Sequence, residues 1–197
     1  MRTLSNALVY LIGFAGAGKL TTARALAGLI DARIVDNHWI NDPVFKLIRA
    51  DGLTPLPPAI WPRTDEIRAA VCETVATLSP PEWNFVFTNV LREGDAHDLA
   101  IYRVIEATAA RRRALFVPVT LVCAGDELAR RVTAAERRAA QKDVNPARAL
   151  DRAANEAPLR PPHPNALTVD NTALEPAATA ARIAEHALAI ARRGDAR

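Results

Sequence analysis

The chain has 197 residues, of which 50% are hydrophobic and 24% are charged, proportions that are typical of one globular domain with a full core. Its formal net charge of +3 is a small excess, and only 5% of its residues are aromatic, so the composition disfavours a nucleic-acid-binding protein that stacks bases. The sequence has no apolar run of 18 residues, which argues against a membrane span, and its two cysteines, Cys72 and Cys123, lack metal-ligand spacing.

Hydrophobic patterns divide the chain into alternating strands and helices. In chain order they predict a strand at 7–12, a helix at 20–30, a strand at 32–35, helices at 42–50 and 63–78, a strand at 85–90, a helix at 97–113, a strand at 114–123, helices at 126–140 and 145–155, a strand at 166–169 and a helix at 176–193. Pro43 is expected in the first turn of its helix, and the proline-rich segments 52–62 and 158–164 are expected to be irregular.

This alternation predicts the fold class. Strands followed by helices, five times over, require a parallel sheet with helices on both faces. The sequence contains no repeat and no second domain, so residues 1–197 are expected to form one α/β domain. Because ligands of such sheets bind at the carboxyl ends of the strands, the segments that follow the strands are the candidate site. These segments are 13–20, 36–38, 89–92, 124–126 and 170–172.

The first of these segments, GFAGAGKL at 13–20, follows the phosphate-binding loop pattern G-x-x-x-x-G-K for seven residues. Its glycines let backbone N–H groups approach a polyphosphate, and Lys19 is expected to reach the β- and γ-phosphates. Lysine is rare in this chain, which has only Lys19, Lys46 and Lys142 among 25 basic residues, so a lysine here favours a specific role. The predicted nucleotide-binding residues of the loop are Gly13, Phe14, Ala15, Gly16, Ala17, Gly18, Lys19, Leu20 and Thr21.

The eighth position of the loop departs from the pattern. It is normally Ser or Thr, whose hydroxyl binds Mg²⁺, and here it is Leu20. Either Thr21 or Thr22 supplies the hydroxyl instead, or Mg²⁺ is held by waters and by the nucleotide with Asp36 behind them. Thr21 and Asp36 are the predicted metal contacts. A loop that binds nucleotide without catalysing a reaction is the alternative.

The whole chain resembles the small P-loop kinases of the shikimate kinase, gluconate kinase and nucleoside monophosphate kinase group, and also bacterial ATPases with a GKLT variant of the loop. The segments that carry the resemblance are YLIGFAGAGKLTTARALA, DNHWINDPVF, ELARRVTAAERR and ALTVDNTALEP. The resemblance implies a three-layer P-loop NTPase fold with a five-stranded parallel sheet in the order 2-3-1-4-5. It also implies an Arg-rich, mobile lid at about 126–156 and ATP as the phosphate donor.

Asp36 matches the position after the second strand where shikimate and gluconate kinases place a carboxylate that faces the acceptor hydroxyl. A carboxylate at this point orients or deprotonates a hydroxyl that is aimed at the γ-phosphate. Asn37 and His38 follow Asp36 and are predicted to bind the acceptor. The alternative is structural: Asp36 or Asn37 caps the following helix, and His38 packs beside an aromatic ring.

Further polar residues are predicted on the acceptor side. Asn89 ends the third strand, where many P-loop proteins place an acidic metal ligand, and it is predicted to hydrogen-bond the substrate. Arg92 follows it, and Arg63 and Arg68 begin the helix after the proline-rich loop, a region where the resembling kinases bind the anionic part of the acceptor. All three arginines are predicted to bind substrate, and a solvated surface position is the alternative for each.

The predicted helix 126–140 supplies the arginines of the lid. Arg130 and Arg137 share one face and Arg131 and Arg138 another, because the members of each pair are seven residues apart. A guanidinium that points inward would stabilise the transferring phosphoryl group. We predict that Arg131 is catalytic, that Arg130 binds nucleotide and that Arg137 binds substrate. The alternative is a solvated face on which the arginines pair with glutamates of the same helix.

These motifs together predict a cytoplasmic ATP-dependent kinase that transfers the γ-phosphate to a small-molecule hydroxyl, with Mg²⁺ as the second cofactor. Its catalytic residues are expected to be Lys19, Asp36 and Arg131, and the resemblance implies that Asp170 lies near the adenine. Two alternatives stay open: a nucleoside monophosphate kinase, and a non-catalytic nucleotide-binding regulator. The expected partner is a small-molecule phosphate acceptor, with no nucleic acid and no membrane, and the protein is expected to be a monomer or a homodimer.

Overall fold

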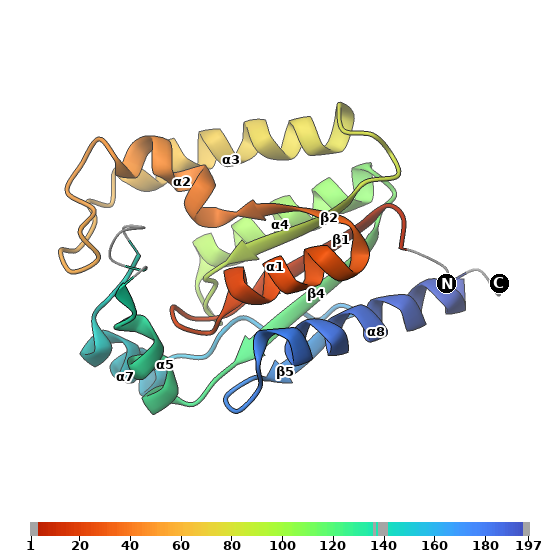
Figure 1. Ribbon diagram of the computed structural model, residues 1–197. Coiled ribbons are helices and arrows are strands. Elements are labelled where there is room, and N and C mark those ends of the chain that lie inside the picture. Colours follow the sequence, from red (N-terminus) through yellow and green to blue (C-terminus); the bar gives the residue numbers. More distant parts are fainter. Residues whose placement is uncertain (1–3, 136, 138–141, 195–197) are drawn as a thin grey trace.

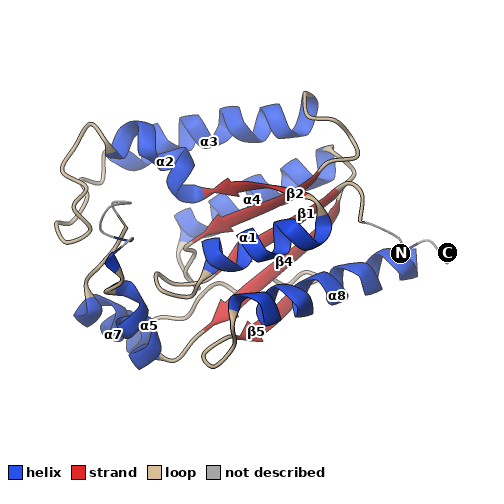
Figure 2. Ribbon diagram, in the orientation of Figure 1, coloured by secondary structure: helices blue, strands red, loops and turns tan. Residues whose placement is uncertain are grey.

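The computed structural model describes residues 4–135, 137 and 142–194, which form one sheet between layers of helices (Figure 1, Figure 2). Its strands are β1 (Ala7–Ile12), β2 (Ala32–Asp36), β3 (Asn84–Asn89), β4 (Leu115–Val122) and β5 (Leu167–Asp170). Neighbouring strands are parallel and their order is β2-β3-β1-β4-β5, which confirms the predicted fold class and strand order. The helices are α1 (Lys19–Ile30), α2 (Asn37–Phe45), α3 (Ile60–Thr77), α4 (Ala96–Arg111), α5 (Gly125–Val132), α7 (Pro146–Asn155) and α8 (Pro176–Gly194).

The central strand β1 divides its side chains between two cores. Val9 and Leu11 pack with residues of α1 and α8 on one face of the sheet. Leu8, Tyr10 and Ile12 pack with residues of α3 and α4 on the other face. All six residues of β1 are buried, so the strand is apolar throughout instead of alternating with polar residues. Burial on both faces fixes β1, and with it the start of the loop that follows.

Two prolines lie at helix positions other than those predicted. The helix expected at 42–50 is α2, which begins directly after β2, so Pro43 lies inside it rather than in its first turn. Burial of Ile40 and Phe45 determines where this helix forms, because these side chains pack towards α3 and its loop. Conversely, α3 begins three residues earlier than predicted, and Pro62 lies in its first turn, where no N–H is needed.

The prediction of a single helix at 126–140 is also wrong, because α5 ends at Val132. Leu128 and Val132 are its buried residues, and Thr133 forms its C-cap. The Thr133 hydroxyl donates to the Arg130 carbonyl at 2.7 Å, which satisfies one of the carbonyls that a helix end leaves free. Arg138, which was predicted on this helix, lies outside the described residues.

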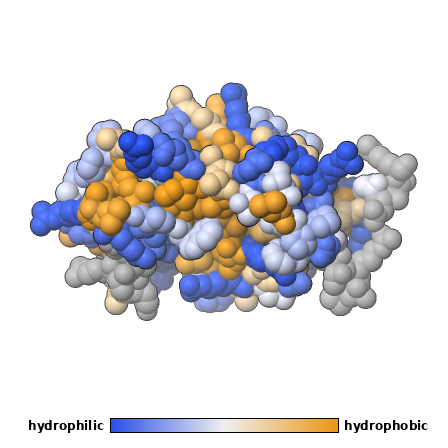
Figure 3. All heavy atoms as spheres, turned by 90° about the horizontal axis from the view of Figure 1, so that it is seen from above, coloured by the Kyte–Doolittle hydropathy of each residue, from blue (hydrophilic) through white to orange (hydrophobic). Residues whose placement is uncertain are grey.

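Two helical lobes rise beyond the carboxyl edge of the sheet. One consists of α2, the start of α3 and the loop between them, and the other of α5 and α7 (Figure 1). Seen from the side of α2 and α3, apolar groups gather across the middle of the surface and hydrophilic side chains lie around them (Figure 3). Trp39 and Leu47 are among the exposed apolar side chains of this lobe. Among the described helices, none is long and apolar enough to cross a membrane.

Candidate active site

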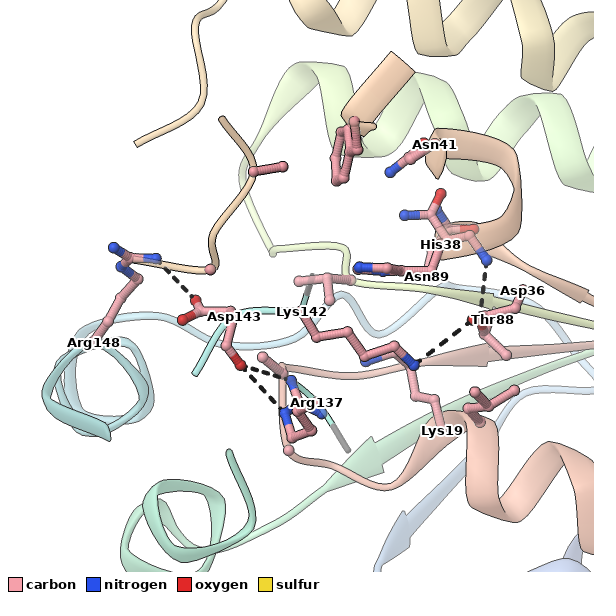
Figure 4. Close-up of a pocket in the computed structure, with 18 of the residues that line it drawn as sticks. Lys19, Asp36, His38, Asn41, Thr88, Asn89, Arg137, Lys142, Asp143 and Arg148 are labelled. Carbon is pink, nitrogen blue, oxygen red and sulfur yellow. Dashed lines mark hydrogen bonds and ion pairs between the residues drawn. The ribbon is translucent and has the colours of Figure 1, made fainter. Parts of the chain in front are cut away.

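The carboxyl ends of the central strands open into a cavity of about 1250 Å³ (Figure 4). Its wall is formed by the loop 13–20, the start of α1, the ends of β2 and β3, the proline-rich loop, and the lid segment from α5 to α7. Single small-molecule sites usually have volumes of roughly 300–1,000 Å³. The size and the two-lobed wall therefore suit two ligands that meet over the sheet.

The cavity wall is strongly basic. Its described residues include ten lysines or arginines and three aspartates, whereas the formal net charge of the whole chain is only +3. Positive charge is thus concentrated at this site, and a cleft of one sign attracts ligands of the other. The cations are Lys19, Arg24, Arg68, Arg92, Arg130, Arg131, Arg137, Lys142, Arg148 and Arg152.

The phosphate-binding loop lies between β1 and α1, as its motif requires. Gly16 has a φ of +88°, and a Cβ at this residue would lie only 2.9 Å from the Leu128 carbonyl oxygen, so α5 packs directly on the loop. The Gly13 N–H donates to the Asn89 carbonyl at 3.3 Å, which ties the loop to β3. Residues 15, 16 and 18–21 line the cavity, whereas Gly13, Phe14 and Ala17 are buried beside it.

Lys19 is the first residue of α1. Its Nζ donates to the carbonyl oxygens of Gly13 at 2.7 Å and Phe14 at 2.9 Å. Burial, followed by the positive charge of Arg137, lowers the pKa of Lys19 to about 7 against the opposing effect of Asp36. A phosphate beside Nζ would supply the negative charge that favours the ammonium form, so the loop is suited to an anionic ligand.

Asp36 ends β2 and lies beside Thr88, its register partner on β3. Its Oδ1 accepts a hydrogen bond from the Thr88 hydroxyl, and its Oδ2 lies 3.9 Å from Lys142 Nζ. Although Asp36 holds the N-cap position of α2, its carboxylate makes no capping hydrogen bond with the described residues. The capping alternative is therefore wrong for this side chain, and the carboxylate lines the cavity instead.

A network of amide and guanidinium groups lies beside the end of β3. Asn37 Oδ1 accepts hydrogen bonds from Asn89 Nδ2 at 2.8 Å and from Arg68 Nη2 at 3.3 Å. Arg68 is only 4% exposed, its Nη1 lies 3.5 Å from Asp65 Oδ1, and its Nε and Nη1 have no hydrogen-bond partner among the described residues. Asn41 Oδ1 is likewise buried and has no hydrogen-bond partner among the residues that the structure describes. Arg68 and Asn41 both line the cavity, where a ligand can satisfy these atoms.

The predicted metal contacts can be compared with the donor groups of this site. Leu20 and Thr21 both line the cavity. Of the aspartates described in its wall, Asp98 pairs with Arg92 and Asp143 with Arg148, which leaves Asp36 as the carboxylate without an arginine partner. The described residues contain no group of three His, Cys, Asp or Glu side chains that could hold a metal ion. Such a donor set fits Mg²⁺ that arrives with a nucleotide and keeps its waters, with Asp36 and Thr21 as protein oxygens.

Three other predicted acceptor residues have different surroundings. His38 lines the cavity and packs edge to face with Phe45, with ring centroids 5.9 Å apart. Arg92 also lines it, but its Nε lies 2.9 Å from Asp98 Oδ2 and its Nη2 bonds Asp95, so most of its charge is neutralised. Arg63 is not among the residues described in the cavity wall, and it is exposed and pairs with Glu66 of its own helix.

The lid arginines separate into three environments. Arg130 is exposed and pairs with Glu127. Arg131 donates from Nη2 to the carbonyl oxygens of Asn171 at 3.1 Å and Thr172 at 3.0 Å, so it joins α5 to the turn after β5. Arg137 is half-buried in the cavity wall, where burial lowers its pKa and its Nε and Nη2 donate to the Asp143 carbonyl at 3.2 and 2.9 Å. Of the three, Arg137 is the one that pairs with no carboxylate of the described residues and bonds within the lid, so it is the best placed of them to face a phosphate.

The predicted adenine-side residue, Asp170, is exposed and is not among the residues described in the cavity wall. Its Oδ1 accepts hydrogen bonds from the Thr172 N–H at 2.9 Å and the Thr172 hydroxyl at 2.7 Å. The neighbouring Asn171 instead contacts the phosphate-binding loop, because its Nδ2 donates to the Ala17 carbonyl at 2.8 Å. Asn171 therefore positions the loop, and Asp170 shapes the turn.

Several site residues were not predicted from the sequence. The most informative is Lys142, whose ammonium faces Asp36 (Figure 4). Its signal was present, because the scarcity of lysine that drew attention to Lys19 applies equally to Lys142. Thr88 gave no such signal, since its role depends on the register that pairs it with Asp36. The other cavity-wall residues that were not predicted one by one are Arg24, Asn41, Asp143, Arg148 and Arg152.

The lid is joined to the proline-rich loop across the mouth of the cavity. The Val144 N–H donates to the Gly52 carbonyl at 3.3 Å, and Arg148 Nη2 donates to the Leu53 carbonyl at 2.8 Å. Gly52 has a φ of +76°, and a Cβ there would lie 2.2 Å from the Lys142 carbonyl oxygen. We call these contacts the lid latch: Gly52 and Leu53 on one side, and Lys142, Val144 and Arg148 on the other.

The fold is shared with solved small-molecule kinases. A gluconokinase from Sinorhizobium meliloti is similar with a TM-score of 0.68 and 16% sequence identity, covering 98% of this chain and 97% of that one. An APS kinase from Mycobacterium tuberculosis, in complex with AMPPNP and APS, has a TM-score of 0.55 and 17% identity over 93% of this chain and 98% of its own. A shikimate kinase from Acinetobacter baumannii, in complex with shikimate, has a TM-score of 0.51 and 14% identity over 95% and 94% of the two chains.

Comparison at the level of sequence gives no match. Neither the protein-family models nor the curated proteins contain one that matches this chain. At identities of 14–17%, the solved structures show that the chain has the fold of the P-loop kinases.

Proposed function

We propose that this protein is an ATP-dependent kinase that transfers the γ-phosphate of ATP to a hydroxyl group of a small anionic molecule. One observation carries the proposal: Lys19 of the phosphate-binding loop and the Asp36 carboxylate line the same cavity, whose wall holds ten cations. Lys19 and the surrounding positive charge suit the phosphates of the donor. The Asp36 carboxylate suits the hydroxyl group of the acceptor.

In the proposed reaction, the acceptor oxygen forms a bond to the γ-phosphorus while the bond from that phosphorus to the bridging oxygen of ADP breaks. Asp36 takes the proton of the acceptor hydroxyl. Lys19 and Arg137 stabilise the charge on the transferring group, because both are cations held in a partly buried wall. Mg²⁺ bound to the nucleotide would neutralise part of the phosphate charge, with Asp36 and Thr21 as its protein contacts.

Two buried groups on the acceptor side support an anionic acceptor. The Nε and Nη1 of Arg68 are donors without a hydrogen-bond partner among the described residues, although Nη1 lies 3.5 Å from Asp65 Oδ1 in an ion pair, and they suit a carboxylate or another planar anion. The unpaired Asn41 Oδ1 suits a hydroxyl donor of the same molecule. A nucleoside monophosphate acceptor is less well supported, because Arg63 is exposed away from the cavity wall and Arg92 is neutralised by two aspartates.

The alternative is a nucleotide-binding regulator without turnover. It is favoured by Leu20, which places an apolar side chain where the loop pattern has a metal-binding hydroxyl. The two functions differ in one respect: both bind ATP, but only the kinase releases ADP in an acceptor-dependent way.

The deciding experiment measures ADP release from Mg-ATP in the presence of pooled sugar acids, other hydroxy acids, amino alcohols and nucleoside monophosphates. For a kinase we expect release with one pool, a loss of about 10²-fold or more in the Lys19→Ala variant, and a loss of similar size in Asp36→Asn with ATP binding retained. ATP binding without ADP release in every pool would instead support the regulator.

A further inference from the structure

Two of the three lysines of this chain line the same cavity. Lys19 comes from the phosphate-binding loop and Lys142 from the lid, and the third, Lys46, lies after α2 and pairs with Asp42. The other basic residues of the chain are arginines, so both cavity positions depart from its usual choice. A lysine ammonium is a compact charge with three donors that can bind oxygens in several directions, which suits phosphate groups.

The position of Lys142 is fixed by its backbone. Its N–H donates to the Arg137 carbonyl at 3.0 Å, and its carbonyl oxygen packs against Gly52 so closely that no Cβ fits there. The next described contact along the chain, from the Val144 N–H to Gly52, continues the lid latch. Closure of the lid on the proline-rich loop therefore determines where the Lys142 ammonium lies.

The ammonium of Lys142 faces Asp36 but is not fully paired by it. Its Nζ lies 3.9 Å from Asp36 Oδ2, and Asp36 already accepts the Thr88 hydroxyl through its other oxygen (Figure 4). Arg137 and Arg24 line the same cavity, so the carboxylate of Asp36 stands against several cations. A polyphosphate would supply further negative charge beside the Lys142 ammonium.

The phosphate-binding loop offers little to hold a metal at this place. Leu20 has no oxygen in its side chain, and β3 ends in Thr88 and Asn89 rather than in a carboxylate. In P-loop proteins the metal neutralises the charge of the β- and γ-phosphates. A fixed ammonium beside the same phosphates performs part of that neutralisation without a metal ligand.

We propose that Lys142 is a phosphate-binding residue, carried into the site by the closed lid, which partly offsets the hydroxyl that Leu20 does not supply at the eighth position of the loop and lets ATP bind without the metal. This inference rests on the proposed binding of ATP to the loop, but not on the phosphoryl transfer. It makes the ammonium of Lys142 a direct contact of the terminal phosphate, with Asp36 beside it.

The test measures ATP and ADP binding by titration calorimetry, with excess Mg²⁺ and with EDTA. The variants are Lys142→Met, Lys142→Arg, Asp36→Asn and, as the matched control, Lys46→Met, which removes an exposed lysine. We expect the wild type and Lys46→Met to bind ATP in EDTA. Lys142→Met should lose about 10- to 100-fold in EDTA, the change expected for one charge-assisted hydrogen bond, and less with Mg²⁺. The loss should be smaller for ADP, and Lys142→Arg should retain most of the affinity.

The Asp36→Asn variant distinguishes phosphate binding by Lys142 from a simpler role, in which the ion pair between Lys142 and Asp36 only holds the lid closed. If Lys142 only closes the lid through Asp36, both Lys142→Met and Asp36→Asn weaken ATP binding equally, and the proposal is overturned. If Lys142 binds phosphate, Asp36→Asn removes a competing anion and ATP binding in EDTA stays the same or tightens. Equal affinities of Lys142→Met and Lys46→Met in EDTA, or no binding of ATP to the wild type in EDTA, also overturn it. If ATP binds as expected but no acceptor pool gives ADP release, the proposed kinase activity is contradicted and the proposed role of Lys142 is not.

Discussion

At the scale of single residues, Lys19 connects nucleotide binding to pH. Its ammonium is held by two backbone carbonyls, and burial, with the charge of Arg137, lowers its pKa from 10.5 to about 7. Between these two values the unfolded chain binds more protons at this residue than the folded one. The contribution of Lys19 to stability therefore rises with pH from about 7 to 10.5, and its full cost is present below pH 7.

The same shift predicts proton uptake when ATP binds. Phosphate oxygens beside Nζ raise the pKa of Lys19, so above pH 7 the complex holds a proton that the free protein lacks. Calorimetry in buffers of different ionisation enthalpy should show uptake approaching one proton near pH 8 to 9 and almost none at pH 6. ATP affinity should fall as the pH rises over this range.

The Lys19→Arg variant is the control for this linkage, because arginine stays protonated. When ATP binds to this variant, residue 19 should take up no proton. Unchanged uptake in Lys19→Arg would assign the proton to another group and contradict the shifted lysine.

Arg68 predicts where the acceptor binds. Replacing it with Met removes the donors Nε and Nη1 from the cavity wall, and we expect the acceptor KM to rise by about 10- to 100-fold with a smaller change in kcat. Arg63→Met on the same helix is the matched control and should leave both constants unchanged, since Arg63 is exposed. Thermal melts show whether Arg68→Met stays folded, and an unchanged KM in the folded variant would remove Arg68 from the acceptor site.

Site residues that follow a strand could be predicted from the sequence. Site residues that come from the lid could not be told apart in this way. Lys19, Asp36 and Asn89 were found because each comes shortly after or at the end of an apolar run. Arg131 and Arg137 are identical in residue type, lie on the same predicted helix and both line the cavity, but Arg131 bonds carbonyls of the turn after β5 and Arg137 bonds the Asp143 carbonyl of the lid. That difference depends on where α5 ends, and the residue pattern does not determine the end of a helix with only two buried side chains.

At the scale of elements, strands were predicted better than helices, and burial explains why. β1 has the predicted limits, and the other strands differ from prediction by one residue at one or both ends. β1 and β3 are buried along their whole length and β4 in all but its end residues, which gives these three strands clear limits in the sequence. α2 and α5 are short and carry few buried residues, so their limits are set by contacts with other elements. Segments whose position depends on tertiary contacts are those for which local sequence is a weak guide.

The lid latch gives a prediction at this scale. Gly52→Ala places a Cβ 2.2 Å from the Lys142 carbonyl oxygen, so the lid must move away from the proline-rich loop. We expect kcat/KM for the proposed transfer to fall by about tenfold or more, since the lid residues leave their positions over the phosphates.

Gly94→Ala is the matched control for the latch. Gly94 has a φ of +75°, almost the same as the +76° of Gly52, but a Cβ at Gly94 would meet no described atom within 4 Å. Both variants therefore carry a similar backbone cost of about 1–2 kcal/mol, and only Gly52→Ala disturbs the lid. Equal activities of the two variants would show that the latch contributes nothing to turnover.

At the scale of the whole molecule, the cavity joins the sheet to both lobes, and a ligand in it should stabilise all three. ATP at 100 times its Kd adds about 2.7 kcal/mol to the free energy of unfolding. For a domain of about 150–250 residues this corresponds to a rise in Tm of about 5–10 °C, which differential scanning fluorimetry measures directly. Lys19→Ala should show little of this rise, and a full rise in that variant would mean that ATP binds away from the loop.

The fold as a whole followed from the sequence, whereas the substrate did not. The alternation of elements predicted the parallel sheet, the resemblance of the whole chain to small P-loop kinases implied the order of its strands, and the structure confirms both. The proposed acceptor site is built from side chains of α2, α3 and the lid, whose mutual positions are tertiary. Arg63 and Arg68 illustrate the difference, since they are five residues apart on one helix and only Arg68 is described in the cavity wall.

The scarcity of lysine also makes the site chemically addressable. An amine is a nucleophile only when it is neutral, and a lysine with a pKa of about 7 is largely neutral at pH 8, whereas Lys46 is exposed outside the cavity wall and pairs with the Asp42 carboxylate. Acylating reagents at mildly alkaline pH should thus modify Lys19 well ahead of Lys46. Protection of Lys19 from acylation would then report, residue by residue and by mass spectrometry, when the cavity is occupied.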